Sequence, residues 1–199
     1  ALGYQGALGA LKRMGGEAMG LSDLEMTRIV TAWRKASPSI VRLWKNCEEA
    51  ARGAITQGGV ITVNKLCKFY MKAGNLHIQL PSGRVLVYQE AKFNGRSITY
   101  MGMDQIKKIW CKQDTYGGKI VENIVQAIAR DVLANALLMV DRLNFDIVMH
   151  VHDEIVVEAI DIEAERTAKA LTNILCKDIA WAKGLKLGAE TFIADYYTK

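Results

Sequence analysis

The chain has 199 residues, of which 50% are hydrophobic and 24% are charged, as in an ordinary folded globular protein. Its formal net charge of +5 suits a polyanionic partner but does not require one. No uninterrupted apolar run approaches the ~20 residues that cross a bilayer. No signal-peptide pattern opens the chain either. We therefore expect no membrane partner, and a length sufficient for one sizeable core or two small units.

The spacing of the cysteines predicts the state of their thiols. The four cysteines are far apart and lack C-x-x-C spacing, so we expect reduced, packed thiols rather than disulfides or zinc ligands.

Residues 1–11 are apolar and rich in glycine, whereas the edges of natural domains are usually polar. We therefore expect the chain to be a segment of a longer protein.

Two helices are predicted in the first quarter of the chain. Ser22 and Glu25 have the spacing of a capping box and predict a helix to about Lys35. Pro38 at a first helical position predicts a second helix that stops at Gly53. The apolar positions of the two helices are Leu24, Ile29, Val30 and Trp33, and then Ile40, Val41, Leu43, Trp44, Cys47 and Ala51.

The pattern changes to β-structure between residues 58 and 100. Residues 76–80 alternate between apolar and polar, residues 81–83 form a turn, and residues 84–88 return as the second strand of a hairpin. A further short strand is expected at residues 97–100, followed by a bend at Gly102.

Helical periodicity returns after Gly117 and Gly118, which we expect to interrupt the chain before a long helix over residues 119–143. After a hairpin, Asp161 is expected to cap a last helix that ends near Gly184. A final strand is predicted at residues 185–192. This order of elements favours an α+β fold with an antiparallel sheet.

The hairpin at residues 147–157 carries the most informative motif. Two β-branched runs flank His152, Asp153 and Glu154, which we expect at the tip, with both arms buried. Adjacent carboxylates on a fixed turn contribute little stability but suit a divalent cation. A charged turn without any chemistry is the alternative interpretation.

This hairpin resembles motif C of the family A DNA polymerases, the bacterial DNA polymerase I type. Two other stretches fit the same family in the correct order. The segment around Tyr4 resembles the end of motif B in phage and prophage polymerases. The helix that starts near Gly117 resembles the one before motif C, and Gln126 falls at the place of the glutamine that reaches the primer–template minor groove in that family. The resemblance therefore extends over essentially the whole chain.

The resemblance implies a part in template-directed DNA synthesis. Asp153 would be a catalytic metal ligand with Glu154 as its auxiliary, in a two-metal Mg²⁺ site that this chain supplies only in part. Tyr4 would bind the incoming nucleotide, and His152 and Gln126 would contact DNA, the glutamine through the minor groove. The partners would be primer–template DNA, dNTPs and the remainder of the polymerase chain, in the cytoplasm of a bacterial host.

The same resemblance implies a division of the chain and an incomplete catalytic centre. Residues 1–116 would be fingers-derived helices with a β-hairpin insertion, and residues 117–199 would be the palm portion with the antiparallel motif C hairpin. The motif A aspartate and the motif B lysine and arginine of the family are not found in this sequence. The chain by itself is therefore expected to be inactive.

Two readings from other classes stay open. The first is a metal-dependent nuclease or other hydrolase, including a zinc site built from His150, His152 and Asp153. The second is a basic nucleic-acid-binding module without catalysis.

Overall fold

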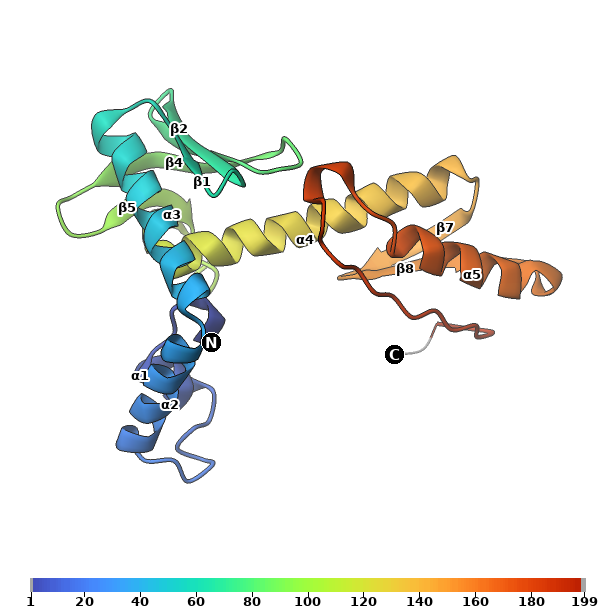
Figure 1. Cartoon of the computed structure of the whole chain (residues 1–199), viewed down its shortest axis with the longest axis horizontal. Coiled ribbons are helices and arrows are strands. Elements are labelled where there is room, and N and C mark those ends of the chain that lie inside the picture. The colour runs from blue at the N-terminus through green and yellow to red at the C-terminus, as the bar shows by residue number, and fades with distance from the viewer. Residues whose placement is uncertain (1, 198–199) are drawn as a thin grey trace. The chain divides into compact units, whose positions relative to one another are not determined.

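A computed structural model describes residues 2–197, which form two compact units (Figure 1). The first unit extends to Val125 and the second begins at Gln126. Helices and antiparallel strands are both present, so the predicted α+β class is confirmed. The functional division between residues 116 and 117 stays a prediction.

The first unit opens with a short 3₁₀ helix, Leu2–Tyr4, and three α-helices: α1 (Leu8–Arg13), α2 (Asp23–Ala36) and α3 (Pro38–Gln57). The predicted capping box is confirmed, because the Ser22 side chain accepts from the Glu25 amide while the Glu25 carboxylate accepts from the Ser22 amide. The predicted stop at Gly53 is wrong. A Cβ there would lie 2.6 Å from Ile61 Cδ1, so this glycine serves close packing inside α3, and the helix ends before Gly58.

The buried stripe of α2 also differs from the prediction. Leu24 and Ile29 are exposed, while Met26 and Val30 are buried. The helix packs against α1, α3 and the first 3₁₀ helix, and its half-buried Trp33 stacks on Trp44 of α3 with ring centroids 5.9 Å apart. The predicted apolar stripe is therefore wrong at Leu24 and Ile29, and it omitted Met26.

A six-stranded antiparallel sheet follows, with neighbouring strands in chain order. Its strands are β1 (Val60–Val63), β2 (Cys67–Lys72), β3 (Asn75–Gln79), β4 (Val85–Phe93), β5 (Ile98–Met103) and β6 (Trp110–Thr115). The predicted hairpin is confirmed as β3 and β4, with Leu76 opposite Tyr88 and a turn closed by the Leu80 amide on the Arg84 carbonyl. The predicted bend at Gly102 is wrong, because Gly102 pairs with Cys111 inside β5.

One face of this sheet packs on α3, which runs beside it in Figure 1. Phe69, Leu76 and Ile78 on the sheet are fully buried, and the facing side of α3 is lined by small residues and Trp44. Close packing of small helix residues on aromatic and branched strand residues excludes water from this interface. It also buries two thiols, and desolvation raises the pKa of Cys47 to about 12 and that of Cys67 to about 11.

Helix α4 (Gly117–Arg142) crosses from the first unit into the second. The second unit then contains β7 (Asp146–Val151), β8 (Glu154–Glu158), the 3₁₀ helix Asp161–Glu163, α5 (Ala164–Leu175) and the 3₁₀ helix Ala180–Ala182. Gly117 and Gly118 are the first residues of α4 rather than a break before it. Asp161 starts a 3₁₀ turn without capping α5, and α5 ends at Leu175, well before Gly184.

The C-terminal part of the chain corrects a further prediction. Residues 185–192, which were expected to form a strand, have no regular secondary structure. Lys186, Gly188 and Thr191 interrupt this stretch, in which apolar and polar residues alternate only weakly. Among the described residues, β7 and β8 pair with each other in a sheet of two strands. Unpaired strands are unstable in isolation, which explains the difference.

The core of the second unit is small. Ala136 and Val140 of α4 pack with Leu171 and Ile174 of α5. The hairpin contributes residues that are only half-buried, among them Ile147, Ile155 and Val157. The expectation that both arms would be buried is therefore wrong for the described chain: one side of the hairpin packs on the helices and the other faces outward.

Helix α4 also bears on the expected absence of a membrane partner. By length and composition it is apolar enough to cross a membrane, with a mean hydropathy of 1.3 over its best window. It contains charged residues, including Arg130 and Asp131, and contributes Ile120, Ile124 and Val140 to buried cores. Core helices of folded proteins commonly have this composition, so the feature is weak support for a membrane span.

Candidate active site

The carboxylates of the predicted site lie at a two-residue turn. Val151 pairs with Glu154, so His152 and Asp153 form the turn and Glu154 is the first residue of β8. The side chains of His152, Asp153 and Glu154 are all exposed. The structure therefore brings three of the predicted site residues together, with two carboxylates accessible next to one another.

The turn adopts a conformation that is uncommon for its sequence. His152 has a φ of +50°, in the left-handed region that favours glycine. Two-residue hairpin turns need a positive φ at their first central residue, because this twist matches that of the strands. A histidine held there indicates that the surrounding strands impose the turn on this residue.

A tyrosine that the sequence analysis missed contacts the site. The Tyr197 hydroxyl donates a hydrogen bond to Glu154 Oε2 at 3.1 Å. Desolvation raises the pKa of Tyr197, and the hydrogen bond to Glu154 and the charge of its carboxylate raise it further. The two residues are far apart in sequence and share no motif, so no pattern in the sequence could have paired them.

Gln126 lies on the side of α4 that faces the hairpin within the second unit. One turn further along the helix, Arg130 Nη1 lies 3.4 Å from Nδ1 of His150 on β7. Residues four apart on a helix share a face, so Gln126 and Arg130 project on the same side. Gln126 is exposed, and its amide is therefore free of the protein core. Arg130 was missed by the sequence analysis, although its i+4 spacing from Gln126 was a usable signal.

The side chains at the hairpin provide only part of a metal site. Among residues 2–197, no three His, Cys, Asp or Glu side chains are close enough together to hold a metal ion. A zinc site built from His150, His152 and Asp153 therefore gains no support. Two neighbouring carboxylates provide the hard oxygen donors that Mg²⁺ prefers, but only part of its octahedral shell.

Tyr4 belongs to a separate, well-anchored segment of the first unit. The indole of Trp44 donates to the Gly3 carbonyl at 3.0 Å. The Arg34 guanidinium donates to the carbonyls of Gln5 and Gly6, both at 3.3 Å. Tyr4 itself is half-buried in the 3₁₀ helix Leu2–Tyr4. Its backbone is thus held by side chains from α2 and α3.

The start of α4 is bonded to the same segment. The Gly118 amide donates to Gln5 Oε1 at 2.8 Å, and the Gly117 amide donates to Glu48 Oε2, also at 2.8 Å. A Cβ on Gly117 would collide with the Trp44 carbonyl, and one on Gly118 would lie 2.5 Å from the Tyr4 carbonyl oxygen. The two glycines therefore allow the helix to begin directly against the Tyr4 segment, and side chains satisfy the first two amides of the helix.

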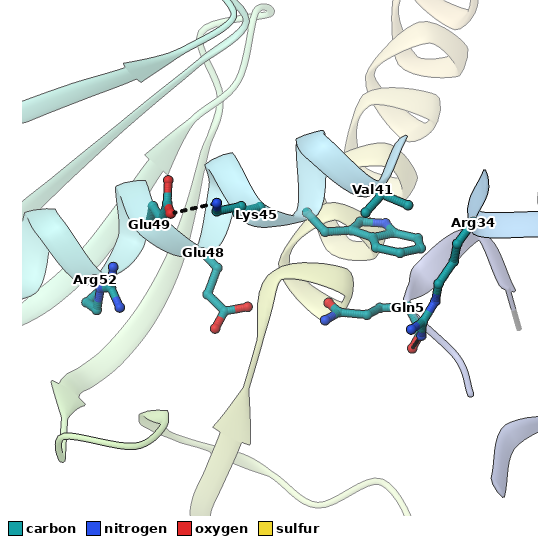
Figure 2. A pocket seen from close by; sticks show the side chains of 8 residues that line it. Gln5, Arg34, Val41, Lys45, Glu48, Glu49 and Arg52 are labelled. Atoms are coloured by element: carbon teal, nitrogen blue, oxygen red, sulfur yellow. Dashed lines mark hydrogen bonds and ion pairs between the residues drawn. The ribbon is translucent and has the colours of Figure 1, made fainter. Parts of the chain in front are cut away.

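A cavity of about 280 Å³ adjoins this junction (Figure 2). Its lining mixes both charges, with Lys45 3.9 Å from Glu49 and Arg34 stacked 6.0 Å from the centre of the Trp44 ring. The full lining is Gln5, Arg34, Val41, Trp44, Lys45, Glu48, Glu49 and Arg52. The convergence of Tyr4 with the Asp153 hairpin on one cleft stays a prediction.

Comparison with known proteins shows that the chain is similar in sequence, over its whole length, to a segment of a phage DNA polymerase. The resemblance indicated by the motifs is thereby confirmed. The relative is the DNA polymerase of Bacillus phage SP02, which is 42% identical over 205 aligned positions covering 100% of this chain and 31% of the relative. The chain thus spans about a third of that polymerase. No family model matches the chain, and no solved structure matches it.

Proposed function

We propose that this chain is the fingers–palm segment of a DNA polymerase of the family A type, which transfers a nucleotide from a dNTP to a primer 3′ hydroxyl. The observation that carries this proposal is a pair of adjacent exposed carboxylates on a hairpin turn, in a chain that is similar throughout to a phage DNA polymerase. Its partners would be primer–template DNA, dNTPs and the rest of the polymerase, in the cytoplasm of a bacterial host.

Asp153 is the metal ligand in this proposal, and Glu154 assists it. Bound Mg²⁺ would lower the pKa of the primer hydroxyl and neutralise charge on the triphosphate. Asp153 lies in the turn and is open to solvent, so its carboxylate can meet an ion without rearrangement of the hairpin. Glu154 already accepts a hydrogen bond from Tyr197, which favours an orienting or water-mediated role for its carboxylate.

Gln126 and His152 are the proposed contacts to DNA. A glutamine amide can donate to the acceptors that every correct base pair presents in the minor groove. Gln126 is exposed on the helix face whose next turn contacts the hairpin strand through Arg130, which suits a contact close to the primer end. Gln126→Ala in the parent polymerase should weaken duplex binding or extension after a mismatch, with unchanged secondary structure.

The chain by itself would hold only part of the catalytic centre. One pair of carboxylates under-ligates a two-metal site, and the sequence contains no recognisable lysine–arginine clamp for the triphosphate. A hydrolase would need further ligands converging on the hairpin, and the described residues provide none. The similarity of the whole chain to a phage DNA polymerase favours the polymerase reading over the nuclease reading.

The test is single-nucleotide incorporation by the parent polymerase that contains these residues. Asp153→Ala should lower the incorporation rate by at least about 10³-fold, a loss of about 4 kcal/mol of transition-state stabilisation. Glu154→Ala should have a smaller effect. Asp178→Ala is the matched control, because Asp178 is an exposed aspartate in a loop of the same unit, and it should leave the rate unchanged. Near-normal incorporation by Asp153→Ala would refute the assignment.

A further inference from the structure

The outer face of the sheet formed by β1–β4 has an unusual composition. Residues directly opposite one another in an antiparallel sheet share a face. The register therefore places Val60, Tyr70, His77 and Val87 in one row across four strands, on the face opposite the buried Phe69 and Ile78. Val60 is 63% exposed and Val87 is 49% exposed, so this row is open along its length.

Two rings lie at the centre of this row. Tyr70 and His77 stack with their centroids 5.2 Å apart and their planes at 19°. Both side chains are half-buried, on the face of the strands opposite the buried Phe69 and Ile78. The His77 ring is further held by a contact of 3.2 Å between Nδ1 and the Asn75 carbonyl. The rings are thus pre-ordered on an outward face, which lowers the entropy lost when a ligand stacks on them.

Positive charge surrounds the rings. Lys68 and Lys72 lie two residues to either side of Tyr70 on β2, so they share its face, and both are exposed. Residues 60–89, which include the whole of β1–β3, contain four lysines and arginines and no aspartate or glutamate. This segment therefore carries lysines and arginines with no acidic side chain between them. A polyanion is the ligand that such a face complements.

We propose that this outer face, which we call the β1–β4 platform, binds single-stranded DNA. Lysines would neutralise backbone phosphates while unstacked bases lie against the Tyr70–His77 pair and its valine neighbours. The row spans three inter-strand spacings, about 14 Å, comparable to four-stranded sheets that stack two or three bases. Duplex DNA has no free base faces to offer, so the rings distinguish a single strand from a duplex. The platform shares no residue with the Asp153 hairpin, and the proposal does not depend on polymerase activity.

Fluorescence anisotropy with labelled oligo(dT) of about 12 nucleotides tests the proposal on the full 199-residue chain. Tyr70→Ala with His77→Ala should weaken binding at least about fivefold. Tyr70→Phe should bind like the unmodified chain, because it retains the ring. Affinity for a blunt hairpin duplex should be the same for all of these variants.

The charge contribution is tested by the salt dependence. Lys68→Ala with Lys72→Ala should reduce the slope of log affinity against log salt by about 1.4, since each single-strand phosphate contact contributes about 0.7. Lys107→Ala with Lys108→Ala is the matched control, because it removes the same charge from the exposed β5–β6 connection and should leave the slope unchanged.

Two single substitutions guard against misfolding of the double variants. Val87 is exposed within the row, so Val87→Glu and Val87→Lys differ in charge at one position. Val87→Glu should weaken oligo(dT) binding, and Val87→Lys should maintain or strengthen it. The proposal is overturned if the chain does not bind oligo(dT), if the ring-deleted chain binds as tightly as the unmodified one, or if both lysine pairs have the same effect.

Discussion

The two units of this chain differ in how thoroughly they bury their strands. In the first unit, Phe69, Leu76 and Ile78 are fully buried between the sheet and α3. In the second unit, the β7–β8 hairpin has no fully buried residue among those described, and Val148 is 58% exposed. The well-packed region holds no proposed catalytic carboxylate, whereas the thinly packed hairpin holds both. The residues proposed for catalysis therefore lie on the strands that are less buried within this chain.

The largest expected effect on stability is in the first unit. Phe69→Ala removes a fully buried ring from β2 and should destabilise this unit by about 3–5 kcal/mol. Hydrogen exchange of peptides from β1–β4, followed by mass spectrometry, would measure the change. Peptides from β7 and β8 should keep their protection. Equal loss of protection in the β1–β4 and β7–β8 peptides would show that the two units do not unfold separately.

A comparable truncation in the second unit should have a smaller effect. Ile155 is only half-buried, so Ile155→Ala loses less transfer free energy and leaves less of a cavity than Phe69→Ala. We expect less than about 2 kcal/mol in the same exchange measurement. A loss above that of Phe69→Ala would reverse the comparison between the units.

Alkaline pH should destabilise the first unit through its buried thiols. The thiols ionise near pH 9.0 when unfolded, whereas burial raises the folded pKa to about 12 for Cys47 and about 11 for Cys67. The unfolded chain therefore releases these protons first, and stability falls as the pH rises from about 9 toward 12. Urea unfolding between pH 8 and pH 11 would measure this slope. Cys47→Ala with Cys67→Ala should flatten it, and an unchanged slope would contradict the assignment.

The smallest effect is expected at the hairpin turn. His152 has a φ of +50°, so His152→Gly should relieve strain and stabilise the hairpin by about 1 kcal/mol. His152→Ala keeps the strain and should give no gain. Exchange protection of the β7 and β8 amides would distinguish the two variants, and equal protection would show that the turn is unstrained.

Local signals predicted local structure well in this chain. The capping box at Ser22, the β3–β4 hairpin and the β7–β8 hairpin depend on residues close in sequence, and all three are present. Gly53 was misread because its role is a tertiary contact with Ile61, which no local pattern encodes. The predicted strand at residues 185–192 failed because a strand requires a partner.

The candidate site shows the same limit. The motif placed His152, Asp153 and Glu154 at a hairpin, since they are consecutive. Tyr197 approaches the hairpin from a segment that is distant in sequence, and its contact with Glu154 follows only from the fold. Arg130 could have been found from its i+4 spacing to Gln126, but its contact with His150 required the structure. The thiols divide similarly: Cys47 and Cys67 are buried as expected, whereas Cys176 is exposed and Cys111 is partly exposed.

Template-directed primer extension tests most directly the central claim, that this chain holds part of a polymerase catalytic centre. The chain of residues 1–199, freed of host polymerase, would be assayed with Mg²⁺ and all four dNTPs beside the parent polymerase that contains the same residues. We predict extension by the parent, its loss in the parent with Asp153→Ala, and no extension by the chain alone. Robust extension by the chain alone that is abolished by Asp153→Ala would contradict the account, because the chain would then contain a complete centre.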